Sequence, residues 1–334
     1  MKLIRLITVL LTAALIAAAC GGDSDNPLGS SDVQVEAEEQ AAIEEEADEA
    51  EEEAALEDDA AMEEEAEAEQ EQAAADAVGQ PAAIVSLSPS STEILFAIGA
   101  GEQVIAVDSF SNYPAEAPIT DLSASEPNTE AILGFEPDLV ITSGSTEEFV
   151  AAMDAAGVPV LQQFAAASID DTYAQIEQLG AETGHVAEAA ELVLNMQTEV
   201  GELAAQATGS GTYYHELDDT LFSVTTSTFI GNVYSIAGLT NVADAADPDG
   251  EFFGFPQLNA EFLVDADPDL IFLADTKCCG QNAETVSARP GWDTLTAVQE
   301  GRIFELDDDI ASRWGPRVVD FLRIIVEATA TISS

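Results

Sequence analysis

Two stretches of the sequence share one pattern, and this repetition limits the folds that the chain can adopt. The first, Glu130–Ile141, opens with a glutamate, continues through a short apolar segment and reaches Pro137-Asp138 before a β-branched run. The second, Glu261–Phe272, places a glutamate, an apolar segment and Pro268-Asp269 at the same spacing. Each copy predicts a helical turn, a break at Pro-Asp and a buried strand. Two such units predict two similar α/β lobes, and two lobes imply a cleft in which the function should be sought.

The segments around the two copies alternate between predicted strands and helices. This alternation predicts largely parallel sheets covered on both faces. In the first lobe we expect strands at Ile84–Leu87, Val104–Val107, Leu139–Thr142 and Val158–Leu161. In the second lobe we expect a strand near Leu221–Val224, a helix over Phe229–Ala237, a strand at Arg302–Leu306 and a last helix over Val318–Thr329.

Between the lobes, apolar residues recur at helical spacing over His185–Ala207, which predicts one long joining helix that limits hinge motion. The domain boundaries that follow are 1–19 for an export signal, 20–81 for a tether, 82–183 for the first lobe, 184–209 for the linking helix and 210–334 for the second lobe.

The charge balance of the chain is extremely acidic. Eight Lys and Arg stand against 65 Asp and Glu, a formal net charge of −57 in 334 residues. Apart from Lys2 and Arg5, every basic residue lies at or after Lys277, so the first lobe has none. Nucleic-acid binding is excluded as a function class because phosphate contacts need clustered Lys and Arg.

The N-terminal segment has the pattern of an export signal. Lys2 and Arg5 precede the apolar run Leu6–Ala19, which is short for a membrane span and ends in small residues. Ala17–Gly22 resembles a bacterial lipobox, which implies that Cys20 becomes the lipidated first residue of the mature protein. Ordinary secretion with an unmodified cysteine is the alternative. Residues 32–76, mostly Glu, Asp, Ala and Gln, predict a disordered tether that acts as a solvated spacer rather than as a calcium buffer or docking segment.

Four motifs in the folded part carry a resemblance to a known family. They are Ser86–Gly99, Asn128–Val140, Glu261–Ile271 and Pro290–Ile303, in this order along the chain. Together they resemble the substrate-binding proteins of ABC importers for ferric siderophores, haem and cobalamin, over roughly residues 82–330. The resemblance implies a class III periplasmic-binding-protein-like fold of two Rossmann-like lobes joined by one long helix. It also implies an extracytoplasmic, lipid-anchored and monomeric protein that delivers a ligand to a membrane permease.

The resemblance gives the two repeated glutamates a role. In the family, one surface glutamate on each lobe pairs with arginines of the permease, and Glu130 and Glu261 stand at those motif positions. Charge-assisted pairs of this kind would fix the docking orientation. The alternative is that each glutamate merely stabilises the first turn of a helix.

The ligand is expected to be a metal chelate, with no resident cofactor or metal. Tyr113, Phe252, Phe253 and Trp314 could stack on a flat or macrocyclic ligand, although each could instead belong to the core. Arg313, beside Trp314, is the strongest candidate for an anionic group. Since the first lobe has no cation, the sequence favours cobalamin or a neutral or cationic hydroxamate complex over an anionic catecholate.

Cys278 and Cys279 are adjacent, and outside the cytoplasm such a pair forms either a strained vicinal disulfide or two unpaired thiols. A soft-metal site is the weakest alternative because no His or third Cys lies near them in sequence.

Two other function classes compete with ligand delivery. An enzyme has little support because the only histidines are His185 and His215, and no motif places Ser or Cys beside a base. A surface scaffold or metal-scavenging lipoprotein without a transport role is the second alternative. Thermal shifts with ligands would separate a binding protein from a scaffold.

Overall fold

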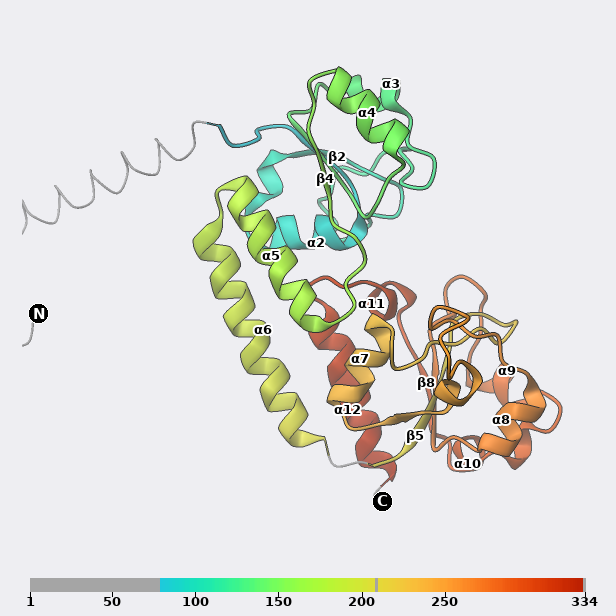
Figure 1. The fold of residues 1–334 in the computed structure, drawn as a ribbon. Helices are drawn as coiled ribbons and strands as arrows, with labels where there is room; N and C mark the ends of the chain where they lie inside the picture. The colour runs from blue at the N-terminus through green and yellow to red at the C-terminus, as the bar shows by residue number, and fades with distance from the viewer. Residues whose placement is uncertain (1–78, 208–209, 333–334) are drawn as a thin grey trace, which may run out of the picture. The chain divides into compact units, whose positions relative to one another are not determined.

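The computed structural model describes residues 79–207 and 210–332 of the protein (Figure 1). These residues form two four-stranded parallel sheets with the same strand order, in which the first strand of each lobe lies between the second and the third. The strands of the first sheet are β1 (Ile84–Leu87), β2 (Val104–Val107), β3 (Leu139–Thr142) and β4 (Val160–Gln162). Those of the second are β5 (Thr212–Glu216), β6 (Thr240–Asn241), β7 (Leu270–Leu273) and β8 (Ile303–Glu305). The predicted fold of two similar α/β lobes is confirmed.

Helices connect and cover these strands. The helices up to residue 207 are α2 (Pro89–Ala97), α3 (Thr129–Leu133), α4 (Glu147–Ala155), α5 (Ile169–Thr183) and α6 (Val186–Gln206), with a 3-10 turn η1 (Ala100–Gln103). Those from residue 210 are α7 (Phe229–Ile236), α8 (Ala260–Ala266), α9 (Ala283–Ser287), α10 (Thr296–Gln299), α11 (Asp308–Ser312) and α12 (Val318–Ile332), with the 3-10 turns η2 (Val242–Ala246) and η3 (Trp292–Thr294). The predicted export signal, Cys20 and almost all of the tether lie outside the described residues.

The two repeated units fold alike. Asn128 and Asn259 each accept a hydrogen bond from the backbone N–H three residues later, at 3.0 Å in both copies. An asparagine in this position satisfies one of the free N–H groups at a helix start, so it begins α3 and α8. Glu130 and Glu261 follow two residues later and are exposed in the first turn of each helix.

The aspartate of each Pro-Asp pair fastens the first strand of its lobe to the third. The Asp138 carboxylate accepts the backbone N–H of Ala82 at 2.9 Å, and the Asp269 carboxylate accepts that of Thr212 at 2.8 Å. Ala82 lies just before β1, and Thr212 begins β5. The repeated Pro-Asp therefore has a structural role, since it sets where two neighbouring parallel strands begin.

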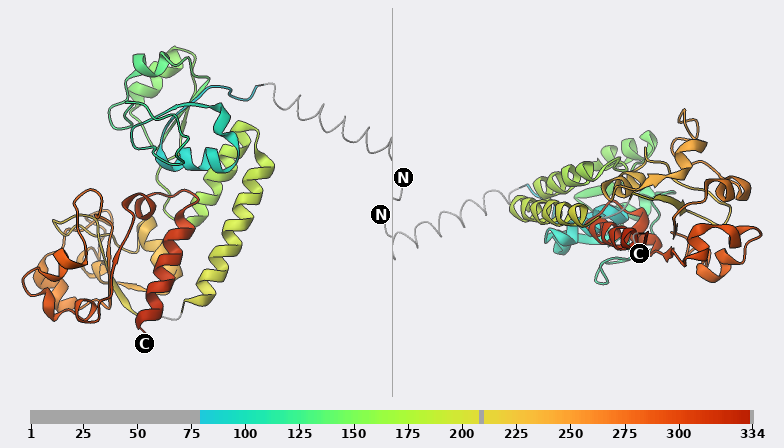
Figure 2. Two further views of the ribbon diagram at one scale, coloured as in Figure 1. Left: turned by 180° about the vertical axis from the view of Figure 1, so that it is seen from behind. Right: turned by 90° about the horizontal axis from the view of Figure 1, so that it is seen from below.

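Helix α6 is the long joining helix predicted over residues 185–207, and it begins at Val186 with His185 in the capping position. It is accompanied by α5 and α12, which both pack against it (Figure 2). A Cβ at Gly180 of α5 would lie 2.4 Å from Cβ of Ala189, so the close approach of α5 and α6 requires glycine there. At its start, α5 touches the second lobe, where the Ile169 N–H donates to Asn232 Oδ1 of α7 at 3.2 Å.

One hydrophobic core cluster runs through both lobes, and each lobe also has a separate cluster of its own. The shared cluster contains buried residues of α2, α5, α6, α7 and α12, among them Ile94, Ile176, Val193, Val233 and Phe321. Because interiors of this kind are close-packed, the joining helices form part of a shared core rather than a flexible linker.

The predicted strand at Leu221–Val224 is wrong, because the first strand of the second lobe is β5, at Thr212–Glu216. Two polar residues of β5, His215 and Glu216, are fully buried. They interrupt the run of apolar residues by which a buried strand is predicted. His215 forms a hydrogen bond with the Tyr234 hydroxyl at 2.8 Å, and Glu216 pairs with Arg289. Phe222 instead makes a single antiparallel bridge in a loop.

Candidate functional site

In parallel α/β sheets, ligands bind beyond the carboxyl ends of the strands. The loop that follows β2 in the first lobe carries Phe110 and Tyr113, which are both exposed. In the second lobe, Lys277 follows β7, and α11 follows β8. Contacts between the segments that follow β1, β2, β7 and β8 therefore define the candidate site.

Glu93, on α2 of the first lobe, is the centre of these contacts. It is only 3% exposed and accepts hydrogen bonds from two arginines of the second lobe. Arg313 Nη1 donates to Glu93 Oε1 at 2.9 Å. Arg317 donates through Nε to Oε2 at 2.9 Å and through Nη2 to Oε1 at 2.5 Å. This is a buried, charge-assisted cluster that joins residues more than 200 positions apart in sequence.

Asp309 extends the cluster. Its carboxylate pairs with Arg313 at 2.7 Å and accepts from Asn112 of the first lobe at 3.2 Å. It also pairs with Lys277 at 2.9 Å. Hydrogen bonding to Lys277 and the charge of Arg313 hold the pKa of Asp309 below its ordinary value, although its partial burial opposes this shift.

All six basic residues in the described part of the chain are ion-paired with carboxylates. The pairs are Lys277 with Asp307 and Asp309, Arg289 with Glu216, Arg302 with Glu300, Arg313 with Glu93 and Asp309, Arg317 with Glu93, and Arg323 with Glu199 and Asp320. Every Lys and Arg in residues 79–207 and 210–332 therefore already has a carboxylate partner. An anionic ligand would meet no unpaired cation among these residues.

Of the residues predicted to bind the ligand, Tyr113, Phe252 and Phe253 are exposed. Tyr113 is 45% exposed, and the Arg317 guanidinium lies 4.1 Å from its ring centroid. Phe252 and Phe253 are exposed on the loop before α8, where the backbone N–H groups of Phe252 and Gly254 donate to Asp247. Tyr113 and the two phenylalanines remain candidates for stacking on a ligand.

Arg313 and Trp314 are less accessible than predicted. Arg313 is 8% exposed, and its charge is taken up by Glu93 and Asp309. Trp314 packs against the main core, and its buried indole N–H has no acceptor within the described residues. The Trp314 backbone N–H donates to Ser90 Oγ at 3.2 Å, so this segment holds the lobes together.

Glu93 belongs to the site although its role was not predicted, because it lies in a motif whose Ser and Thr suggest only a helix start. Arg317 was expected near the cleft, together with Lys277, Arg289 and Arg313, but its pairing with Glu93 was not predicted.

Cys278 and Cys279 lie on the loop after β7, and both are exposed free thiols in the structure. The loop is held by Asp308, whose carboxylate accepts the backbone N–H groups of Thr276, Lys277 and Cys278 at 2.9–3.1 Å. Within the described residues, no three His, Cys, Asp or Glu side chains are grouped to hold a metal ion.

A second buried charged group lies at the carboxyl ends of β5 and β7. Arg289 donates two hydrogen bonds of 2.6 Å to the buried Glu216 carboxylate, and its guanidinium lies over Trp292 at 4.6 Å. Asp275 is also fully buried, and neither of its carboxylate oxygens has a hydrogen-bond partner among the described residues. Its burial, reinforced by the neighbouring Glu216 carboxylate, raises the pKa of Asp275 to about 7.

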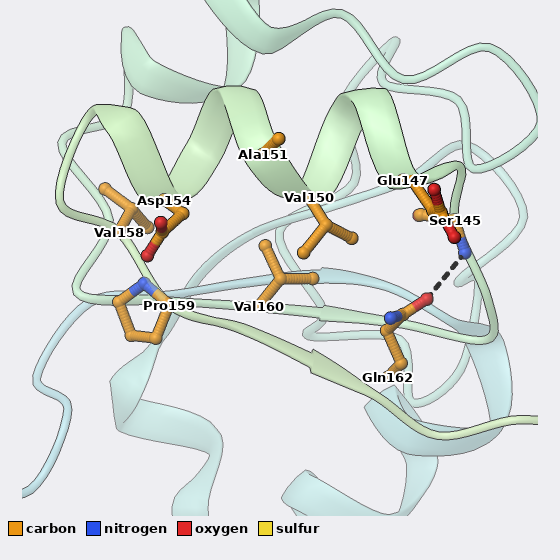
Figure 3. A pocket seen from close by; sticks show the side chains of 9 residues that line it. All are labelled: Ser145, Glu147, Val150, Ala151, Asp154, Val158, Pro159, Val160 and Gln162. Atoms are coloured by element: carbon orange, nitrogen blue, oxygen red, sulfur yellow. Dashed lines mark hydrogen bonds between the residues drawn. The ribbon is translucent and has the colours of Figure 1, made fainter.

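The cavities found in the first lobe do not coincide with this site. One of about 500 Å³ lies between α4 and the edge strand β4, with Val150 and Val160 facing each other across it (Figure 3). Glu147 and Asp154 are at its two ends. A second, of about 480 Å³, lies beside the start of α3. None of the residues predicted to bind the ligand lines either cavity.

The side-chain carboxylates of Glu130 and Glu261 have no hydrogen-bond or ion-pair partner among the residues that the structure describes, and both residues are exposed. Their carboxylates are therefore available to a partner protein. In the same described ranges, every helix is too short or too polar to cross a membrane.

Comparisons with known proteins agree with this geometry. The family described as "Periplasmic binding protein" matches residues 84–310. An uncharacterized ABC transporter substrate-binding lipoprotein of Bacillus subtilis (strain 168), YvrC, is 27% identical over 261 residues, which are 75% of this chain and 80% of that protein. A cobalamin-binding protein of Halobacterium salinarum is 27% identical over 253 residues, 72% of this chain and 67% of that protein. Among solved structures, the apo form of the periplasmic heme-binding protein RhuT from Roseiflexus sp. RS-1 matches with a TM-score of 0.66 and 25% identity, over 75% of this chain and 99% of that one.

Proposed function

Because the chain belongs to the periplasmic binding protein family, we propose that it captures an uncharged or cationic metal chelate between its lobes and delivers it to an ABC-importer permease. A cobalamin or a neutral or cationic ferric hydroxamate complex fits this description. The chain acts as a monomeric, extracytoplasmic binding protein.

One observation carries the choice of ligand, namely that every described Lys and Arg already has a carboxylate partner. An anionic chelate would have to displace one of these carboxylates or remain unpaired in a partly desolvated site, and both cost free energy. An uncharged chelate can bind instead by stacking on exposed aromatic rings such as Tyr113, Phe252 and Phe253. The relatives named for binding cobalamin support the same ligand class.

A thermal-shift panel tests this proposal. It would contain cyanocobalamin, haem, a neutral ferric trihydroxamate and a trianionic ferric tricatecholate. We expect cyanocobalamin or the trihydroxamate to raise the melting temperature by several degrees, because ligands that bind only the folded state stabilise it. If none of the four ligands raised the melting temperature, the metal-chelate assignment would be refuted.

Glu130 and Glu261 are the proposed contacts with the permease. The double variant Glu130→Gln/Glu261→Gln is expected to weaken permease binding by about 100-fold or more, because each lost charge-assisted pair costs about 1.5–3 kcal/mol. Its melting temperature and ligand affinity should not change, since neither carboxylate has a partner within the described residues. Pull-down with the reconstituted permease measures the effect. The matched control is Glu284→Gln, which changes an exposed glutamate in the first turn of α9. Retention of permease binding by the double variant would remove the docking role.

Cys20 is the proposed lipid-anchor site, and the acidic segment after it is the proposed spacer. The support is the sequence around Cys20, which follows an apolar export-type segment. Cys20→Ala should move the protein from the membrane fraction to the soluble fraction of expressing cells. Unchanged partitioning would instead indicate another mode of attachment.

A further inference from the structure

We propose that Glu93 determines the charge class of the ligand by neutralising Arg317, the cation that lies against the exposed ring of Tyr113. This inference rests on the proposed function, in which a metal chelate binds between the lobes. It assigns selectivity to a buried residue of the first lobe that need not touch the ligand itself.

The contacts of Arg317 make it dependent on Glu93. Two nitrogens of its guanidinium donate to the two oxygens of Glu93, at 2.9 and 2.5 Å. Within the described residues, Glu93 is the sole carboxylate that pairs with Arg317. If Glu93 lost its charge, Arg317 would lose its one directly paired carboxylate among the described residues and keep only the weaker Coulomb attraction of Asp307.

Arg313 differs in this respect. It shares Glu93 Oε1 but also pairs with Asp309 at 2.7 Å and donates to the Phe110 carbonyl at 2.9 Å. With Glu93 neutral, Arg313 would keep the Asp309 carboxylate and the Phe110 carbonyl as hydrogen-bond acceptors. The positive charge released by such a change therefore belongs to Arg317.

The position of Arg317 lets a released charge reach a ligand. Its side chain is 17% exposed and its guanidinium lies over the ring of Tyr113, which is 45% exposed at the predicted ligand-binding surface. A chelate stacked on or beside this ring would be within reach of the guanidinium. Coulomb attraction is strong there because the buried cluster is poorly screened by water.

Glu93→Gln is the direct test, since glutamine keeps the shape and one acceptor oxygen but removes the charge. Two pairs of ligands that differ in charge serve as probes, and the members of the second pair are otherwise nearly identical. The first pair is a ferric trihydroxamate and a ferric tricatecholate, and the second is cyanocobalamin and its monocarboxylate, in which one side-chain amide is hydrolysed. For each variant, calorimetry gives the ratio of the two dissociation constants. We expect Glu93→Gln to shift this ratio by about tenfold or more toward the anionic member.

A second substitution shows that the effect passes through Arg317. In Glu93→Gln/Arg317→Gln the freed cation is absent, so the ratio should return to within about threefold of the wild-type value. The matched control is Glu199→Gln, which removes the charge of another arginine partner, on α6, and should leave the ratio unchanged.

Folding is checked by circular dichroism and thermal melting of each variant. If Glu93→Gln does not fold, Arg317→Gln alone provides the test, because Glu93 then carries a charge that only Arg313 offsets. That variant should bind aquocobalamin, which is cationic, more tightly relative to cyanocobalamin than the wild type does.

The outcomes separate the two proposals. A wild-type protein that binds none of the probes refutes the proposed function, and this inference fails with it. A wild-type protein that binds an uncharged probe, together with a folded Glu93→Gln variant whose ratio is unchanged, refutes only the role of Glu93. The role of Glu93 is also refuted if the double variant shifts the ratio of dissociation constants as much as Glu93→Gln does, because the shift would then not depend on Arg317.

Discussion

Replacing Arg289 with alanine is expected to lower the free energy of unfolding by about 3–5 kcal/mol at pH 8, the cost of leaving a buried charge without its partner. Arg289 donates two 2.6 Å hydrogen bonds to Glu216, which is fully buried. Without it, Glu216 and the neighbouring Asp275 would be two buried carboxylates with no cation. The loss should be smaller near pH 5, since protonation can then remove one of the negative charges.

Urea denaturation of the wild type and of Arg289→Ala at the two pH values measures this effect. Arg302→Ala is the control, because the ion pair of Arg302 with Glu300 spans 3.9 Å and the Glu300 side chain is 59% exposed. That variant should lose less than about 1 kcal/mol. Equal losses in the two variants would contradict a special role for the Arg289–Glu216 pair.

The second large effect concerns Asp275. Asp275→Asn is expected to raise the free energy of unfolding by about 2–4 kcal/mol at pH 8 and to leave it nearly unchanged at pH 4. Burial raises the folded-state pKa of Asp275 to about 7, well above its ordinary value of 3.8. Between these two values the folded state holds a proton that the unfolded state releases. This group therefore favours folding most at low pH, and its contribution is lost as the pH rises from about 4 to about 7.

The measurement is the free energy of unfolding as a function of pH for the wild type and for Asp275→Asn. The difference between the two curves should grow from pH 4 to pH 7 and then become constant. Asp265→Asn, which changes an exposed carboxylate on α8, should give a curve parallel to the wild type. A parallel curve for Asp275→Asn would show that Asp275 titrates normally in the folded protein.

Local sequence patterns were sufficient to predict most of the fold. The repeated Glu and Pro-Asp pattern predicts two like lobes because each copy builds the same helix start and the same strand anchor, through Asn128 and Asp138 or Asn259 and Asp269. The pattern fails at β5, where buried His215 and Glu216 interrupt the apolar run. Their partners, Tyr234 and Arg289, lie 19 and 73 residues away, so the sequence gives no local sign that these polar groups are satisfied.

The candidate site was much less predictable than the fold. The exposure of Tyr113 and the clustering of cations after Lys277 follow from local sequence, but the pairing of each cation does not. Glu93 and its arginines are separated by 220 and 224 residues, and only the packing of α2 against the segment before α12 brings them together. For this reason Arg313 was predicted to face the ligand, whereas the structure encloses it between Glu93 and Asp309.

The most direct test of the proposed ligand class is a calorimetric titration with two chelates that differ in charge. One is the uncharged chelate that gives the largest thermal shift, and the other is the ferric tricatecholate trianion. Because all six described cations are paired, we expect a dissociation constant of about 1 μM or lower for the uncharged chelate and one at least about 100-fold higher for the trianion. Binding of the trianion as tight as that of the uncharged chelate, or tighter, would contradict the proposal.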